Sequence, residues 1–152
     1  MPRSRMILCW LYAATALLAL VGTWSQNVAY FRPDEGWLAG FALATWRFWP
    51  ETLATPASTS ITVDLGLLLV PVFALMVIEA RRIGIRFVWL YIVLGILVAI
   101  SVTFPLFLIA RERQLAARGE GSGELGLTRP DVLALLGLAA VMVVVTLWTL
   151  GK

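Results

Sequence analysis

The carboxylates Asp64 and Glu79 lie near the two ends of one apolar run, Thr62 to Arg82, in a sequence without histidine. The commonest general base and metal ligand is therefore missing, and acid–base chemistry would depend on carboxylates such as these two. Fifteen positions separate them, which is about 22 Å along an α-helix. Paired catalytic carboxylates must reach one substrate within several ångströms. The spacing therefore argues against a two-acid catalytic site, and each acid is interpreted with its own neighbours.

The composition indicates that hydrocarbon surrounds most of the chain. The 152 residues are 61% hydrophobic and 14% charged, with a net charge of +3. A soluble domain is about half apolar and a quarter charged, so this chain has too few polar groups to cover a globular surface. The arginines lie at the ends of apolar runs, which favours the lipid bilayer as partner and argues against nucleic acid.

Four apolar runs are long enough to cross a bilayer as helices, which takes about 20 residues each. Their approximate ranges are 6–24, 61–79, 87–110 and 132–150. The predicted fold class is therefore an all-α integral membrane protein with four transmembrane helices in one domain, residues 1–152. Pro71 and Pro105 predict kinks in the second and third helices. The connection 111–131, which contains GEGSGELG, is predicted to be a flexible loop.

The segment 36–49, GWLAGFALATWRFW, is too short to cross a bilayer and carries several tryptophans. Tryptophan prefers the headgroup level of a membrane, where its ring is in apolar surroundings and its N–H group meets water. We predict a short interfacial helix between the first and second spans. Its aromatic surface is either an interfacial belt or a partner surface. The residues of this surface are Trp37, Trp46, Phe48 and Trp49.

Asp64 is the most informative residue, because an ionisable group within a membrane span is costly and marks a functional hypothesis. One interpretation is a structural acid that pairs with Arg47, Arg111 or Arg113, which the four-span topology places on the same side. The other is the anchor of a polar pocket beneath the aromatic segment. Such a pocket would hold a lipid headgroup or an amphipathic small molecule.

A second charged cluster stands where the second span ends and consists of Glu79, Arg81, Arg82 and Arg86. Charges at this position usually form a solvated boundary that sets topology. Arginines there can also contact anionic lipid phosphates, each contributing about 1 kcal/mol.

The orientation of the four spans is not decided by counting basic residues. With a cytoplasmic N-terminus, the two sides hold six basic residues each, so the positive-inside rule gives a tie. The short arginine-rich connection between the second and third spans favours a cytoplasmic N-terminus. We therefore predict a multi-pass protein of the inner (plasma) membrane with both termini in the cytoplasm.

Four motifs occur in an unusual order along the middle of the chain. They are PASTSITVDL (Pro56 to Leu65), VIEARRIGIR (Val77 to Arg86), WLY (Trp89 to Tyr91) and FPLFLIARER (Phe104 to Arg113). Through them the chain resembles an uncharacterised family of small bacterial four-span membrane proteins, known only as a domain of unknown function. The resemblance implies an integral membrane protein of bacterial type. It carries over no activity, so no catalytic residue is transferred.

Three functions are compatible with these features. We predict a non-enzymatic protein without metal or cofactor, which is either an accessory or scaffold subunit of a larger membrane complex or homo-oligomer, or a lipid-binding module. A transporter or channel subunit is an alternative, although few polar residues lie within the spans. The other alternative is a membrane enzyme that acts on a lipid or isoprenoid with Asp64 as general acid.

Overall fold

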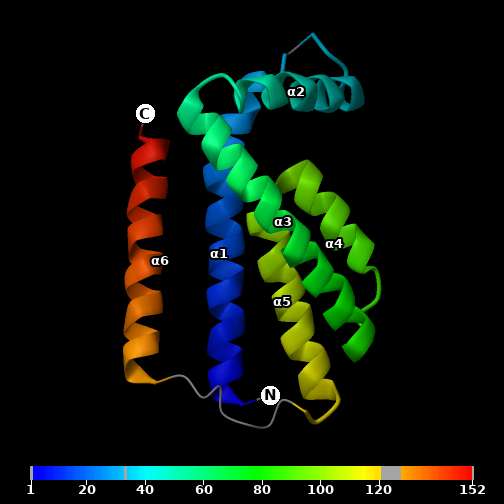
Figure 1. Cartoon of the computed structure of the whole chain (residues 1–152), viewed down its shortest axis with the longest axis vertical. Helices are drawn as coiled ribbons and strands as arrows, with labels where there is room; N and C mark the ends of the chain where they lie inside the picture. Colours follow the sequence, from blue (N-terminus) through cyan, green and yellow to red (C-terminus); the bar gives the residue numbers. More distant parts are fainter. Residues whose placement is uncertain (1, 33, 121–127, 152) are drawn as a thin grey trace.

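A computed structural model describes residues 2–32, 34–120 and 128–151, and these residues form helices with no strand among them. Most of the helices lie along one axis, and α2 lies across one end of the bundle (Figure 1). The elements are α1 (Arg3–Asn27), η1 (Val28–Tyr30), α2 (Trp37–Glu51), α3 (Pro56–Ile83), α4 (Val88–Leu94), η2 (Gly95–Ala99), α5 (Ile100–Ala117) and α6 (Arg129–Leu150).

Four helical segments are long and apolar enough to cross a membrane, by length and composition. They are Arg3–Tyr30, Pro56–Ile83, Val88–Ala117 and Arg129–Leu150. These segments confirm the predicted all-α fold, and α2 corresponds to the predicted short aromatic helix. Each long segment extends beyond its predicted span at one end or both, because the helices continue into the polar residues that flank the apolar runs.

The start and end of α3 follow from local sequence. The Thr55 hydroxyl accepts a hydrogen bond from the Ser58 N–H group, and the Ser58 hydroxyl accepts one from the Thr55 N–H group. This reciprocal cap starts the helix several residues before the predicted position. Gly84 ends it in a left-handed conformation, φ 75°, and the Ile85 N–H group bonds to the Ala80 carbonyl at 2.9 Å.

The third apolar segment turns back on itself instead of running straight. Helices α4 and α5 lie side by side and are joined by the π-helical turn η2 (Figure 1). The ring centroids of Tyr91 and Phe107 are 5.8 Å apart, whereas a straight helix would separate these residues by about 24 Å. The segment is a helical hairpin with a short arm, α4, and a longer arm, α5, and both arms lead from the turn toward the N-terminal end of the bundle (Figure 1).

Two residues of the turn account for this reversal. Ala99 has an extended backbone, φ −177° and ψ 135°, which breaks the helix immediately before α5. Gly95 lies against Thr103, because a Cβ atom on this glycine would stand 2.8 Å from the threonine hydroxyl. The absence of a side chain therefore allows the two arms to approach each other closely.

The two chain termini lie at opposite ends of the bundle (Figure 1). The prediction that both termini lie on one side of the membrane assumed a straight third crossing, which the hairpin does not provide. The predicted loop 111–131 is wrong in its first part, since α5 continues to Ala117. The stretch 121–127 of that loop lies outside the described residues.

The best-packed part of the molecule is formed by α3 and the hairpin. Its buried residues are Met76, Ala80, Val88, Ile92 and Phe107. Helix α6 contributes no buried residue among those described, and it packs on α1 near Gly22, where an added Cβ atom would lie 3.0 Å from the Thr146 methyl group. The hairpin therefore packs closely on α3, whereas most of the described residues of α6 are exposed.

Candidate functional site

A cavity of about 480 Å³ lies beneath α2, where α1 ends and α3 begins. Its walls come from five parts of the chain: the last turns of α1, Tyr30 and Phe31, one face of α2, Leu65 and Leu69 of α3, and residues 95–101 at the turn of the hairpin. These parts are far apart in sequence, and the hairpin brings its turn up to the end of α1. The reversal of the third segment therefore creates the floor of the cavity.

Aromatic rings form the wall between α1 and α2. Trp24 stacks on Phe41 with ring centroids 6.1 Å apart and planes 14° apart. Phe31 lies 6.3 Å from each of these rings, and Tyr30 meets Phe48 edge-on at 5.7 Å. Offset and edge-on ring contacts favour fixed orientations. This wall therefore presents an apolar surface of defined shape, as most small-molecule pockets do.

The face of α2 that borders the cavity is set by residue spacing. Phe41, Ala44, Thr45 and Phe48 line the cavity, and they recur at intervals of three and four residues on one side of the helix. Ala44 is only 3% exposed, and its small side chain leaves room beneath the helix. The Thr45 hydroxyl donates to the Phe41 carbonyl at 2.9 Å, so its polar group is satisfied within the helix.

An ion pair fixes α2 to the segment that precedes it. Arg47 Nη1 donates to Glu35 Oε2 at 2.9 Å and to the Tyr30 carbonyl at 3.1 Å, and Arg47 Nη2 makes a second contact with the same carboxylate. The hydrogen bond from Arg47 lowers the pKa of the Glu35 carboxyl group below its ordinary value. The pair thereby holds the roof of the cavity in place at neutral pH.

The turn of the hairpin, residues 95–101, borders the cavity and carries no charged side chain. Trp24 Nε1 donates to the Val98 carbonyl at 3.3 Å, so one wall residue also binds the floor. Irregular backbone at membrane depth is tolerated where it is buried in protein or lines a cavity. Residues 95–101 are among those that line the cavity, which is where such backbone can be accommodated.

The cavity has no charged side chain among its described lining residues. Apart from aromatic residues, its polar side chains are neutral and belong to Thr23, Gln26, Asn27, Thr45 and Ser101. Neutral groups of this kind can form hydrogen bonds with hydroxyl or carbonyl groups without opposing a charge. The arrangement therefore suits a neutral molecule with a large apolar part and does not suit an ion.

The opposite end of the bundle contains a chain of ion pairs. Glu112 accepts hydrogen bonds from Arg5 Nη1 at 2.5 Å and from Arg111 Nη1 at 2.8 Å. Arg111 Nε also donates to Glu79 at 2.7 Å, and Arg82 binds the same glutamate at 2.7 Å. Glu112 is 3% exposed. This chain ties the start of α1, the end of α3 and the end of α5 together.

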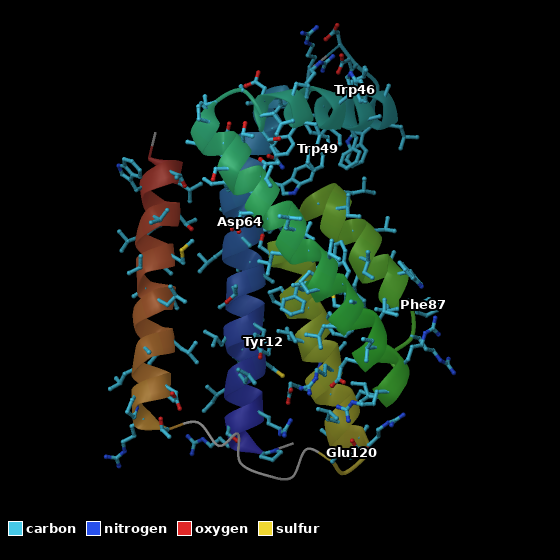
Figure 2. The ribbon with its side chains drawn as sticks, viewed as in Figure 1. Tyr12, Trp46, Trp49, Asp64, Phe87 and Glu120 are labelled. Atoms are coloured by element: carbon cyan, nitrogen blue, oxygen red, sulfur yellow. The ribbon has the colours of Figure 1, made fainter. Side chains whose placement is uncertain are left out.

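Asp64 does not take part in the ion pair or the cavity that the sequence suggested. It is exposed on α3 (Figure 2) and forms no hydrogen bond or ion pair within the described part of the chain. Arg47, one of its three proposed partners, binds Glu35 instead. Because α3 begins at Pro56, Asp64 lies about 12 Å along this helix.

The other two proposed partners of Asp64 lie at the far end of the bundle. Arg111 is engaged by Glu79 and Glu112, and Arg113 is exposed near the end of α5. The reversal at residues 95–99 moves both arginines away from Asp64. The predicted grouping depended on a straight third span and is not present in the structure.

The residues of the second predicted cluster, Glu79, Arg81, Arg82 and Arg86, differ in their contacts. Glu79 binds Arg82, and it also binds Arg111, which sequence reasoning did not connect with it. Arg81 and Arg86 are exposed and form no ion pair within the described residues. The cluster therefore consists of one engaged arginine and two that are available for other partners.

The predicted aromatic surface is also divided. Phe48 and Trp49 line the cavity, whereas Trp37 and Trp46 are 86% and 78% exposed. Figure 2 shows Trp46 on α2 at the outer end of the molecule. Only part of this surface is thus available to an external partner.

Several residues of the cavity and the ion-pair chain were not predicted from sequence. They include Trp24, Phe41, Ala44, Arg5 and Glu112. The three- and four-residue spacing of Phe41, Ala44 and Phe48 was a usable signal for the face of α2. No comparable signal pointed to Glu112, because its partner Arg5 lies far away in the sequence.

Residues 11–113 match the model of a family described as "Protein of unknown function DUF2834". The match covers α2, α3, α4 and most of α1 and α5, and it ends before α6. Neither a curated protein nor a solved structure matches the chain. The matched region includes all the residues that line the cavity.

Proposed function

Because the chain belongs to the family described as "Protein of unknown function DUF2834", which brings no activity with it, we propose a function from the geometry alone. The protein is a non-enzymatic lipid-binding module of the membrane. Its cavity beneath α2 holds the apolar part of a neutral, lipid-like molecule. The observation that carries this proposal is the cavity itself, which is uncharged among the described residues and lined mainly by apolar groups.

Size and surroundings support this proposal. A volume of about 480 Å³ falls within the range of about 300–1,000 Å³ that is usual for small-molecule sites. Asp64 does not line the cavity, so its carboxyl group is not placed to act on a molecule bound there. Binding without chemistry is therefore favoured over the enzymatic alternative.

A substitution that fills the cavity tests the proposal. Ala44→Phe places a ring in the space beneath α2, and we expect the fraction of molecules that retain a bound lipid to fall about tenfold. Native mass spectrometry of the protein released from mild detergent measures this fraction. Ala42→Phe is the matched control, because Ala42 is exposed on α2 and does not line the cavity.

Two results decide the outcome. Loss of lipid from Ala44→Phe with retention by Ala42→Phe supports the cavity as the binding site. Equal retention by both variants and the unmodified protein overturns it. Circular dichroism and gel filtration of each variant show whether the helices and the particle size are preserved, and Ala44→Leu provides a milder filling if the larger ring disturbs the fold.

We also propose that the N-terminal end of the bundle faces the cytoplasm and the α2 end faces the opposite side. The positive-inside rule favours the end with more arginine and lysine as cytoplasmic. Among the described residues the α2 end carries Arg32 and Arg47 only. The N-terminal end carries Arg3, Arg5, Arg81, Arg82, Arg86, Arg111, Arg113, Arg118 and Arg129. The hairpin produces this difference in the number of basic residues, because both of its arms lead from the turn toward the N-terminal end of the bundle.

Labelling with a membrane-impermeant maleimide tests the orientation. In a Cys9→Ala background, a cysteine at Ala39 on α2 should react in intact cells. A cysteine at Glu120, after α5, should react only after the membrane is opened. The reverse pattern would reject the proposed orientation.

A further inference from the structure

A second hollow, of about 430 Å³, lies at the turn between α3 and α4. Arg81 and Arg86 line it together with Phe87 and Trp89. Figure 2 shows Phe87 at this turn, on the side of the bundle away from α6. The hollow shares no lining residue with the cavity beneath α2, and the proposed function does not use it.

The two arginines of the hollow differ from their neighbours in having no anionic partner. Arg82 binds Glu79 at 2.7 Å, and Arg111 binds two glutamates. Arg81 and Arg86 are exposed and form no ion pair among the residues that the structure describes, and no acidic residue lines the hollow. Two positive charges therefore border one hollow, and no described residue neutralises them by an ion pair.

The backbone of the turn brings these residues to one place. Gly84 adopts φ 75°, which ends α3 and turns the chain between Arg81 and Arg86. Phe87 has φ 60° and ψ 32°, a left-handed conformation that is uncommon for a bulky residue. Its ring is nevertheless 76% exposed, so packing within this chain does not account for the unfavourable backbone. Such a combination suggests a role outside the fold of the chain itself.

The aromatic residues indicate where this hollow lies. Phe87 and Trp89 are 76% and 59% exposed, and they stand at the start of the apolar hairpin. Exposed aromatic rings beside arginines are typical of the boundary between hydrocarbon and headgroups. The guanidinium group presents a planar set of donors that matches the oxygens of a phosphate.

We propose that this hollow binds the phosphate group of an anionic membrane lipid. Arg81 and Arg86 donate hydrogen bonds to the phosphate oxygens, and Phe87 and Trp89 contact the part of the lipid that lies closer to the hydrocarbon. A membrane lipid is the source, rather than soluble phosphate, because the rings next to the arginines would otherwise stand in water.

The test compares two double variants that remove the same charge from the same end of the bundle. Arg81→Gln with Arg86→Gln removes both arginines of the hollow. Arg3→Gln with Arg113→Gln is the matched control, because these arginines are exposed and do not line the hollow. Each protein is placed in nanodiscs of phosphatidylcholine with phosphatidylglycerol, and native mass spectrometry counts the lipid of each kind that stays bound.

We expect the unmodified protein and the control to retain phosphatidylglycerol over phosphatidylcholine, and the Arg81/Arg86 variant to lose this preference by roughly tenfold or more. Equal losses in both double variants would overturn the site, since they would indicate general attraction to the charged end. So would the absence of any preference in the unmodified protein.

A competition experiment separates a lipid from soluble phosphate. Inorganic phosphate or glycerol phosphate at millimolar concentration should leave the bound lipid in place. Displacement of the lipid by either compound would overturn the assignment to a membrane lipid. The Ala44→Phe variant should keep its preference for phosphatidylglycerol, so failure of the cavity proposal and failure of this one are distinguishable.

Discussion

The two ends of the bundle hold their helices together by different means. At the α2 end, stacked rings border a cavity and an ion pair between Arg47 and Glu35 fixes the roof. At the N-terminal end, a chain of ion pairs runs through Glu112 and Glu79 and joins three helices. One end therefore keeps an apolar space open, and the other end clamps the helices that shape this space.

Ion pairs and aromatic contacts therefore have separate structural roles at the two ends of the bundle. Buried ion pairs are specific in geometry, because each partner is costly to leave alone. Apolar contacts are less directional and can enclose molecules of varied structure. The charged end therefore fixes the position of the hairpin, and the aromatic end contains the cavity in which we propose that a lipid binds.

Removal of Glu112 should have the largest effect on stability. Glu112→Leu leaves Arg5, whose side chain is only 14% exposed, without its carboxylate partner, and we expect a loss of about 3 kcal/mol in the free energy of unfolding. Unfolding in mixed micelles with increasing dodecyl sulfate, followed by circular dichroism, measures this value. Glu120→Gln, at an exposed position of the same end, is the control and should change little.

A double variant distinguishes loss of the ion pair from loss of packing. Arg5→Met with Glu112→Leu removes both charges, and Arg111 keeps its contact with Glu79. We expect the double variant to regain much of the stability that Glu112→Leu loses, because no buried charge is left alone. A double variant as unstable as Glu112→Leu would show that the helices need the carboxylate for another reason.

A methyl group on Gly95 should have the next largest effect, and it acts on the floor of the cavity. Its Cβ atom would lie 2.8 Å from the Thr103 hydroxyl and 3.1 Å from the Ile100 side chain. We expect Gly95→Ala to lower the free energy of unfolding by about 1–3 kcal/mol and to weaken lipid retention at the cavity. Gly66→Ala on α3 has open space around it and should be neutral or slightly stabilising.

Sequence alone predicted the helical class, the four apolar segments and the short aromatic helix. These features depend on composition and on residue spacing within one segment, which the sequence contains directly. The reversal at Gly95 and Ala99 was not predicted, because the segment is uniformly apolar and its length fits a straight span. A single glycine does not reveal that Thr103, eight positions further on, will lie against it.

The site was predicted less well than the fold, and for a related reason. Asp64 is an acid within an apolar run, which predicts a functional role, but its side chain is exposed and the cavity is uncharged among its described lining residues. Glu112 followed the third apolar run and was overlooked, although it is buried by contacts with Arg5 and Arg111. Which acid is buried depends on contacts between distant segments, and the unrecognised hairpin determines those contacts.

Substitution of Asp64 should therefore have a small effect. Asp64 has no partner within the described residues, so Asp64→Asn breaks no contact and should change the free energy of unfolding by less than about 0.5 kcal/mol. The same micelle titration used for Glu112 measures this value. A loss as large as that of Glu112→Leu would show that Asp64 has a partner, such as a second copy of the chain or another protein.

The smallest effect should be the response of the α2 end to acid, because the pair between Glu35 and Arg47 is partly exposed. The hydrogen bond from Arg47 lowers the pKa of Glu35, so the folded protein holds the ionised carboxylate to a lower pH than the unfolded chain does. The stabilising contribution is fully present above the unfolded pKa, which is about 4.3 for glutamate. It is lost as the pH falls through the folded pKa.

Hydrogen exchange of the amides in residues 34–47 measures this response between pH 7 and pH 3, after correction for the intrinsic dependence of exchange on pH. Protection of α2 should decrease at the acid end of this range in the unmodified protein. Glu35→Gln should show weaker protection throughout and no step, because it cannot titrate, whereas Glu51→Gln should retain the step. If the step persists in Glu35→Gln, another group controls the attachment of α2, and the single ion pair is not what holds the roof of the cavity.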